Sequence, residues 1–292
     1  MNVENKGIVN IALAALLWGS LGLFGKTLNS NGVMPIAVVA IRILIAFVCL
    51  LFYWFFIKKE IPKIKRSDIP LLLLYTLFSV IAYNYLYFSA ISLIPIAIAA
   101  ILLYLSPIFV VLLSSMFLGE KLTSQKLIAT IIVLFGTILV INPQNLQNIN
   151  FLGILFGIGS GLTFALYSLF GKKLTKDNDP VSIVTYSFGL GSIGLIAMAV
   201  FSKQISVSYS LNTWILLLIL GLVPTLLAFV SYNSGLKKIE ASKASIISTL
   251  EPVVAAILGF FVLSEKLSFS QITGIVVVIF GIIFISYKKS TS

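Results

Sequence analysis

A glutamate and a proline, Glu251 and Pro252, lie side by side within an apolar stretch that runs from 241 to 263. An ionisable side chain at the centre of a membrane-length segment costs at least about 2.5 kcal/mol to insert, so Glu251 must face a bundle interior or a water-filled cavity. There it can carry a proton across the membrane, bind the amine of a solute, or brace neighbouring helices through hydrogen bonds. Pro252 removes a backbone donor and predicts a kink in the helix.

Arg42, in the apolar stretch 34–57, is the one cation that is expected to be embedded in the membrane, about two turns from the end of its helix. Its guanidinium can pair with Glu251 or with a substrate carboxylate, or it can snorkel and brace backbone carbonyls. Lys26 lies at the end of the first apolar stretch, where it either guards the mouth of a pore or only faces the membrane interface. The candidate gating or structural residues are Lys26, Arg42, Pro107 and Pro252.

Aromatic side chains recur deep within these apolar stretches. Tyr83 and Tyr87 are one helical turn apart, and Tyr232 occupies the corresponding place in a later stretch. Such rings bind amphipathic solutes through stacking, hydroxyl hydrogen bonds and, for cations, the ring quadrupole. The alternative for each ring is a position at the membrane interface, at the level of the lipid headgroups. The candidate substrate-binding residues, with Glu251 also the candidate proton-binding residue, are Trp18, Tyr83, Tyr87, Tyr104, Tyr167, Tyr232 and Glu251.

The element that must position these residues is a membrane-spanning helix. Of the 292 residues, 59% are hydrophobic and only 10% are charged, and about 20 apolar residues in a helix cross the roughly 30 Å hydrocarbon core. The apolar runs are continuous rather than alternating, which excludes a β-barrel. We predict an all-α integral membrane protein with ten spanning helices at about 7–28, 34–57, 69–90, 94–117, 124–141, 151–171, 180–201, 211–235, 241–263 and 269–287.

The formal charge of +11 orients the chain. Nearly all lysines and arginines fall in alternate connections between the predicted helices, for example at 58–66 and 172–176. Because basic connections remain on the cytoplasmic side, both termini are predicted to be cytoplasmic. In a soluble protein the same charge would suggest nucleic acid, but here its distribution already has an explanation, and no nucleic-acid partner is expected.

The sequence matches itself at an offset of 145 to 146 residues. Pro107 corresponds to Pro252, and the Glu-Lys-Leu triplet at 120–122 corresponds to the same triplet at 265–267. Each half holds five helices, an odd number, so the second half enters the membrane inverted, an architecture that secondary transporters use for alternating access. The predicted organisation is a first repeat at 1–142, an external linker at 143–150 and a second repeat at 151–292.

Several short motifs also occur in a characteristic order. They are Ala-Leu-Leu-Trp-Gly-Ser at 15–20 followed by Lys26, then Arg42, Pro107, Leu-Gly-Glu-Lys-Leu-Thr at 118–123, Leu-Glu-Pro at 250–252 and Ser-Glu-Lys-Leu-Ser at 264–268. Over essentially the whole chain this order resembles the EamA-type members of the drug/metabolite transporter superfamily. The resemblance implies exporters of amino acids, nucleosides and small metabolites, with a pore lined by helices one, three, four, six, eight and nine. Because Phe164 stands opposite Trp18 and Ser106 opposite Glu251, the expected site is not chemically symmetric.

We therefore expect a secondary transporter that exports small organic metabolites, amino acids first among them, across the bacterial inner membrane by alternating access. The alternative is an uncoupled facilitator or channel for small amphipathic solutes. A cation antiporter is a weaker rival, because its decisive acid is expected near the start of a shorter, four-helix chain.

The composition also bears on catalysis and partners. With no histidine and one cysteine, Cys49, the sequence shows no catalytic group or metal-ligand cluster, so no enzyme activity, metal or cofactor is expected. The expected partners are a small-molecule substrate, membrane lipid and protons as coupling ion, and the chain is expected to be a monomer or a homodimer.

Overall fold

The computed structural model describes residues 2–143, 150–204, 206 and 208–287. This part of the chain is helical and contains no strand, and ten of its helices are long and apolar enough to cross a membrane. The predicted number and order of spanning helices are thus confirmed, and the first and sixth are longer than predicted. The ten spans are Val3–Ser30, Pro35–Lys58, Arg66–Ile91, Ile96–Phe117, Ser124–Ile141, Phe151–Asp177, Pro180–Phe201, Leu211–Leu236, Ala241–Leu263 and Phe269–Ser286.

Four spans are single α-helices, and the other six are divided. The single helices are α8 (Ser124–Ile141), α9 (Phe151–Asp177), α10 (Pro180–Phe201) and α15 (Phe269–Ser286). The parts of the divided spans are α1 (Val3–Gly19) and α2 (Leu21–Ser30); α3 (Pro35–Phe52) and η1 (Tyr53–Lys58); η2 (Arg66–Asp68), α4 (Ile69–Thr76), η3 (Leu77–Ala82) and α5 (Tyr83–Ile91); α6 (Ile96–Leu103) and α7 (Ser106–Phe117); α11 (Leu211–Leu220), η4 (Gly221–Leu227) and α12 (Ala228–Leu236); and α13 (Ala241–Ser248) and α14 (Leu250–Leu263).

Several spans begin where the sequence supplies an N-cap. The Asp179 carboxylate accepts a hydrogen bond from the Ser182 amide at 3.0 Å, directly before α10. Ser268 and Gln271 form a capping box at the start of α15. These short polar side chains satisfy amide groups that have no partner within the helix, so the apolar segments end at defined points.

The third and eighth spans each contain a π-helical segment near the middle, η3 and η4. In η4, Pro224 cannot donate to the Leu220 carbonyl four residues earlier. The Thr225 hydroxyl donates to that carbonyl at 2.8 Å instead. The wide turns therefore have a local cause in η4, and they change the direction in which the residues beyond them face.

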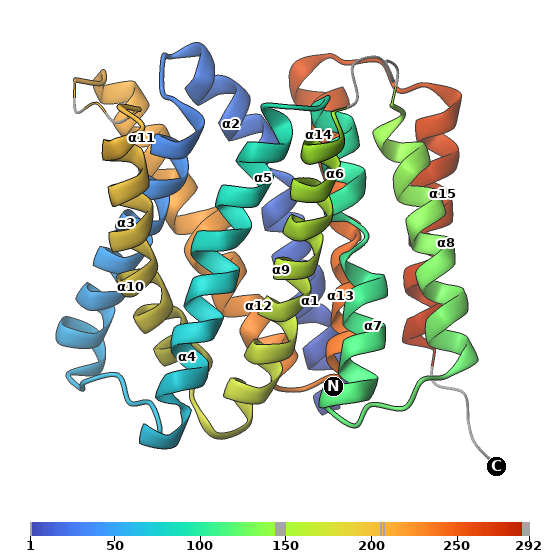
Figure 1. Ribbon diagram of the computed structural model, residues 1–292, viewed down its shortest axis with the longest axis horizontal. Helices are drawn as coiled ribbons and strands as arrows, with labels where there is room; N and C mark the ends of the chain where they lie inside the picture. Colours follow the sequence, from blue (N-terminus) through green and yellow to red (C-terminus); the bar gives the residue numbers. More distant parts are fainter. Residues whose placement is uncertain (1, 144–149, 205, 207, 288–292) are drawn as a thin grey trace.

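The helices pack as two flanking pairs around a central group (Figure 1). α3 packs against α10 on one side, and α8 packs against α15 on the other. The α8–α15 contact requires glycine, since a Cβ on Gly136 would lie 3.0 Å from the Gly274 carbonyl oxygen and one on Gly274 would lie 2.7 Å from that of Gly136. In the centre, α1 contacts α12, α13 and α14, and α9 contacts α5, α6 and α7.

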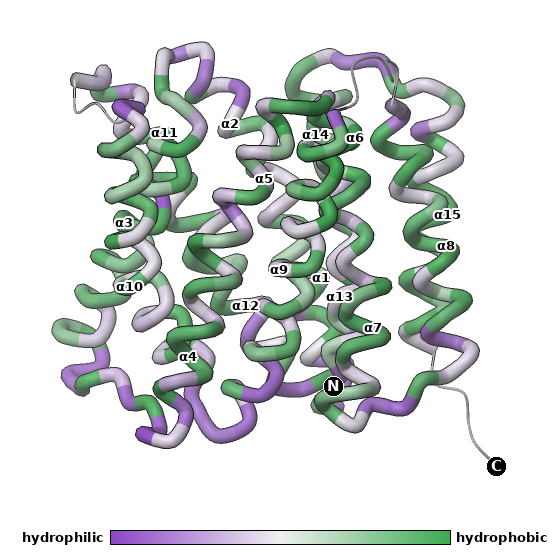
Figure 2. Tube along the Cα trace, in the orientation of Figure 1, coloured by the Kyte–Doolittle hydropathy of each residue, from purple (hydrophilic) through white to green (hydrophobic). Residues whose placement is uncertain are grey.

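The bundle has two polar ends and an apolar middle (Figure 2). We call the end where Val3 and Ser286 lie the terminal end, and the opposite end the distal end (Figure 1). The basic connections gather at the terminal end, at 58–66, 118–123 and 237–240. Of the predicted external linker, residues 144–149 lie outside the described residues, as do Lys288 and Lys289.

Candidate functional site

Two spans are interrupted at corresponding points in the middle of the bundle. The fourth is broken between α6 and α7, and the ninth between α13 and α14. Pro107 and Pro252 lie in the first turn after each break. A proline cannot donate to the carbonyl four residues earlier, which belongs here to Leu103 and Ser248, so neither helix continues unbroken. The predicted kink at Pro252 is a break between two helices.

Glycines on the neighbouring spans pack against both breaks. A Cβ on Gly19 of α1 would lie 2.9 Å from the Glu251 carbonyl oxygen. A Cβ on Gly161 of α9 would lie 2.7 Å from the Leu102 carbonyl oxygen. The backbones of the first and sixth spans therefore lie directly against the interrupted spans, and a side chain at either position would separate them.

Glu251 occupies the first turn of α14, directly after the break. The amide groups of a first turn lack partners within the helix, and the positive end of the helix dipole favours a carboxylate there. The side chain is half-buried, and the Tyr104 hydroxyl lies within hydrogen-bonding range of it. None of the ion pairs between described residues includes Glu251. Its carboxyl therefore has no lysine or arginine partner among the described residues.

Three of the predicted tyrosines surround this carboxyl. Tyr83 and Tyr87 stack one turn apart on α5, with ring centroids 6.3 Å apart, and Tyr104 lies at the break after α6. All three are half-buried and close enough to Glu251 to interact with it electrostatically. We call Tyr83, Tyr87, Tyr104 and Glu251 the half-buried group.

The other predicted aromatics form a separate, buried layer. The ring centroid of Tyr232 lies 5.1 Å from that of Trp18 and 5.2 Å from that of Tyr167. We call these three residues, which are buried, the buried aromatic cluster. Phe164 links the layers, 6.1 Å from Trp18 and 6.0 Å from Tyr83. The predicted ring is thus contiguous but divided, and the half-buried group is the part of it that keeps exposed surface.

Polar residues that were not among the candidates fix the buried aromatic cluster. The Asn233 amide donates to the hydroxyls of Tyr75 and Tyr167 at 3.1 and 3.2 Å. The Ser168 and Tyr232 hydroxyls are 2.7 Å apart. These hydrogen bonds connect α4, α9 and α12 through a buried layer of side chains. Asn233 could have been found from the sequence, because it is an asparagine next to the candidate Tyr232. Tyr75 could not, because the π-helical segment η3 separates it from Tyr83, and α-helical periodicity then does not predict the direction in which Tyr75 faces.

Arg42 lies beside the half-buried group. Its side chain is buried, with 8% of its surface exposed, and its Nη1 atom donates to the Thr225 hydroxyl at 3.1 Å. The guanidinium is close enough to Tyr83 and Glu251 to interact with both electrostatically, but it forms no ion pair with Glu251. Arg42 therefore braces the eighth span at η4 and does not snorkel to the membrane surface.

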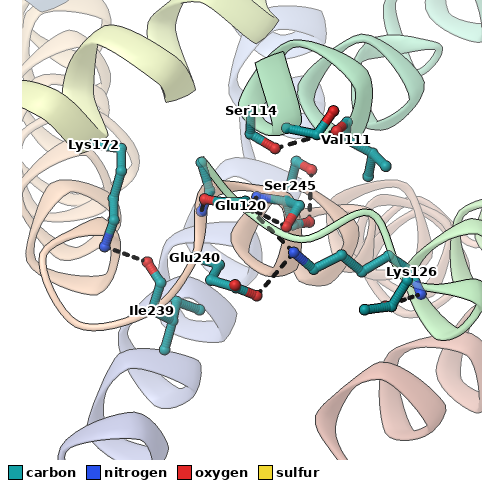
Figure 3. A network of polar contacts seen from close by, with 12 residues as sticks. Val111, Ser114, Glu120, Lys126, Lys172, Ile239, Glu240 and Ser245 are labelled. Atoms are coloured by element: carbon teal, nitrogen blue, oxygen red, sulfur yellow. Dashed lines mark hydrogen bonds and ion pairs between the residues drawn. The ribbon is translucent and has the colours of Figure 1, made fainter. Parts of the chain in front are cut away.

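A carboxylate caps a helix at the terminal end of the bundle (Figure 3). Glu120, in the connection between α7 and α8, accepts hydrogen bonds from the amides of Ala241 and Ser242 at 2.6 and 3.2 Å and from the Ser242 hydroxyl. These groups belong to the first turn of α13. Only 7% of the Glu120 side chain is exposed, and Lys126 lies 3.5 Å from it. We call this contact between Glu120 and α13 the terminal latch.

Cations surround the terminal latch (Figure 3). Lys126 also pairs with Glu240 at 3.0 Å. Lys172 of α9 donates to the Leu236 and Ile239 carbonyls at 2.7 and 2.8 Å, where α12 ends. The positive Lys172 thus holds the C-terminus of α12, and the negative Glu120 holds the N-terminus of α13. Each charge is the one that the dipole of its helix favours.

Among the described residues of the distal end, one ion pair forms, between Lys26 and Glu265. Their charged atoms are 3.0 Å apart, and 64% and 55% of the two side chains are exposed. Lys26 lies on α2, and Glu265 follows α14. Lys26 therefore lies at the distal end of the bundle, in a contact that leaves both side chains largely exposed.

Spanning helices that enclose a carboxylate and tyrosines, with polar contacts at both ends, define a multi-pass membrane protein built around an interior polar site. The sequence model of the EamA-like transporter family matches residues 5–142 and again 151–287. The chain belongs to this family and is a membrane transporter.

Named relatives agree with this assignment. An uncharacterized transporter of Archaeoglobus fulgidus is 28% identical over 95% of each chain. The uncharacterized transporter YwfM of Bacillus subtilis is 30% identical over 94% of this chain and 92% of its own. The uncharacterized inner membrane transporter YicL of Salmonella typhimurium is 27% identical over 98% and 97%. A solved crystal structure, 22% identical, superposes with a TM-score of 0.81 over 97% of this chain and 96% of its own, which shows the fold.

Proposed function

We propose that this protein is a secondary transporter that exports small organic metabolites, amino acids first among them, across the bacterial inner membrane by alternating access. One observation carries the proposal. A half-buried carboxyl without an ion-pair partner, Glu251, lies at the N-terminus of a half-helix in the middle of a ten-helix bundle. Interrupted helices at mid-membrane are where secondary transporters bind substrates and coupling ions.

An inverted duplication of the chain supports alternating access. Contacts between the halves occur in exchanged pairs, because the first span packs against the eighth and ninth, and the sixth packs against the third and fourth. The breaks of the fourth and ninth spans correspond at the sequence offset, and so do the π-helical segments η3 and η4. The two ranges matched by the family model coincide with the proposed repeats, 1–142 and 151–292. Such exchange is expected of two halves related by a two-fold axis in the membrane plane.

The charge of the two ends supports a cytoplasmic terminal end. The connections that gather there carry the lysines and arginines at 58–66, 121, 172–176 and 237–238, whereas the described distal end holds Lys26, Lys203 and Lys266. By the positive-inside rule both termini are then cytoplasmic and the distal end is external.

The burial of the two aromatic layers supports an outward-facing conformation. The half-buried group keeps accessible surface, while the buried aromatic cluster and the terminal latch lie between it and the terminal end. A solute would reach Glu251 from the distal side in this state. In the opposite state the buried aromatic cluster would part, and Trp18, Tyr167 and Tyr232 would gain contact with the solute.

The chemistry of the half-buried group favours an amphipathic amine such as an amino acid. The Glu251 carboxyl binds an ammonium group, and Tyr83, Tyr87 and Tyr104 supply ring faces and hydroxyls for the rest of the solute. Arg42, once released from Thr225, can receive a carboxylate. The same Glu251 can exchange its solute for a proton, which couples export to the proton gradient.

Transport by reconstituted protein tests the proposal. We would load liposomes with labelled amino acids and related metabolites, impose a pH gradient, and follow solute movement for the wild type and Glu251→Gln. The wild type is expected to move solute against its gradient, and Glu251→Gln is expected to lose all pH-driven movement because an amide cannot exchange a proton. Glu60→Gln, which changes an exposed carboxylate in a terminal-end connection, serves as the matched control.

Two other results would change the assignment. Equilibration that is insensitive to pH, in wild type and variant alike, would make the protein an uncoupled facilitator. Loss of monodisperse protein in Glu251→Gln would assign Glu251 a bracing role instead.

A further inference from the structure

The residues of the terminal latch have counterparts in sequence at the distal end, but Glu265 pairs with Lys26 there instead of with a helix N-terminus. At the offset of 145 residues, Glu265 corresponds to Glu120, and Ile96 and Ala97 correspond to Ala241 and Ser242. Ile96 and Ala97 form the first turn of α6, as Ala241 and Ser242 form that of α13. Among the described residues, no side chain forms a hydrogen bond with the amides of Ile96 or Ala97 as Glu120 does with those of Ala241 and Ser242, and Ile96 is exposed.

The lysines follow the same correspondence. Lys26 corresponds to Lys172 at an offset of 146 residues. Lys172 caps the end of α12 through two carbonyls, whereas Lys26 pairs with Glu265 in solvent. The equivalents of those carbonyls belong to Ile91 and Ile94, at the end of α5. At the distal end, the N-terminus of α6 and the C-terminus of α5 thus correspond to the helix ends that Glu120 and Lys172 cap at the terminal end, and no described side chain caps them in the same way.

We propose that Glu120 and Glu265 are alternating latches. In the present conformation Glu120 holds α13 and closes the terminal end. In the opposite conformation Glu265 leaves Lys26 and caps α6 at Ile96 and Ala97, Lys26 caps the end of α5, and Glu120 releases α13. This inference rests on the alternating access proposed above and names the side chains that close each end.

The two latches are unequal, which explains why the structure is closed at the terminal end. Ser242 adds a hydroxyl donor to Glu120, but its counterpart Ala97 has none. Lys126 offsets the charge of Glu120, but its counterpart is the neutral Gln271. Glu265 therefore has fewer partners to gain at α6, and the terminal latch is the stronger of the two.

Thiol labelling in lipid nanodiscs tests the latches. With Cys49 replaced by serine, a single cysteine at Ser245, a buried position of α13, reports opening of the terminal end. Glu120→Gln is expected to raise the labelling rate about tenfold or more, the size expected for loss of a charge-assisted hydrogen bond. Glu265→Gln removes the cap of the opposite conformation and, in the present one, only the exposed pair with Lys26, which contributes little, so it is expected to slow labelling.

A gain-of-contact variant separates latching from general loosening. Ala97→Ser restores the hydroxyl that the distal latch lacks, so it is expected to raise labelling at position 245 about three- to tenfold. That increase is expected to vanish in Ala97→Ser combined with Glu265→Gln, since the added hydroxyl then has no carboxylate to bind. A cysteine at the buried Ala199 of α10 monitors unfolding and is expected to stay unlabelled throughout.

Unchanged labelling in Glu120→Gln, or an Ala97→Ser effect that persists without Glu265, would overturn the proposal. If Glu120→Gln unfolds the protein, the Ala97→Ser pair still decides, because it leaves the terminal latch intact. The assay needs no substrate, so it is independent of the transport test. Normal transport with unchanged labelling would reject the latch proposal and leave the proposed function in place. Changed labelling in a protein that transports no solute would reject the proposed function.

Discussion

The two Glu-Lys-Leu segments at opposite ends of the bundle have the same sequence and different surroundings. Glu120 is 7% exposed and caps a helix, whereas Glu265 is 55% exposed and pairs with one lysine. The difference teaches that equal motifs at equivalent positions need not make equal contacts, because their partners differ. Glu120 meets Ser242 and Lys126, whereas the residues at the corresponding positions for Glu265 are Ala97 and Gln271.

The two contacts also differ in energy. An exposed ion pair contributes about 0 to 1 kcal/mol. Removing one partner of a buried charged network costs about 3 to 5 kcal/mol, because the remaining charge and helix end lose their partners. The terminal end is therefore expected to dominate the stability of this conformation.

The comparison fails if the two ends lie on the same side of the membrane. Lys26 and Lys172 are counterparts in sequence, and Lys172 is half-buried, so its exposed neighbour Lys173 is the better reporter. With Cys49 replaced, a cysteine at position 26 is expected to react with an impermeant thiol reagent only from outside intact cells, and one at position 173 only from inside. Labelling of both from the same side would contradict the inverted repeat.

Removing the terminal latch should produce the larger loss of stability. Glu120→Ala leaves the first turn of α13 uncapped and Lys126 without one of its partners. We expect the apparent melting temperature in detergent to fall by about 5 to 10 °C, which corresponds to a loss of about 3 kcal/mol or more. Size-exclusion chromatography after heating would measure it.

The matched change at the distal end is Lys26→Met, which removes the exposed pair and keeps the apolar stem. The expected shift in melting temperature is about 2 °C or less. Equal shifts for Glu120→Ala and Lys26→Met would show that the difference in burial between the two ends has no energetic consequence.

The positions of the spans, and an interruption at Pro252, could be predicted from the sequence. Long apolar runs leave only a helix as a spanning structure, because every backbone polar group must be satisfied within the segment. Pro107 and Pro252 each remove a donor at a known position, so the interruptions follow from local chemistry. Both predictions depend on neighbours in the chain, which a sequence specifies directly.

The contacts of the site could not be predicted in the same way. The separation of Trp18 from Tyr83 into buried and half-buried layers depends on how the first, third and sixth spans pack against one another. Tyr75 joins Asn233 across a π-helical segment, whose register the apolar pattern does not reveal. Glu120 lies in a connection of ordinary polar residues, and its role exists only because α7 and α13 pack together. Each of these depends on tertiary packing between distant segments.

Paired distance measurements test alternating access most directly. In a background without Cys49, spin labels at the exposed positions Lys121 and Lys237 report the terminal end, and labels at the exposed Asn29 and Ser92 report the distal end. When a transported amino acid binds reconstituted protein, the terminal distance is expected to lengthen and the distal distance to shorten. Two distances that lengthen together, or that both stay fixed in a protein that transports the solute, would contradict the account.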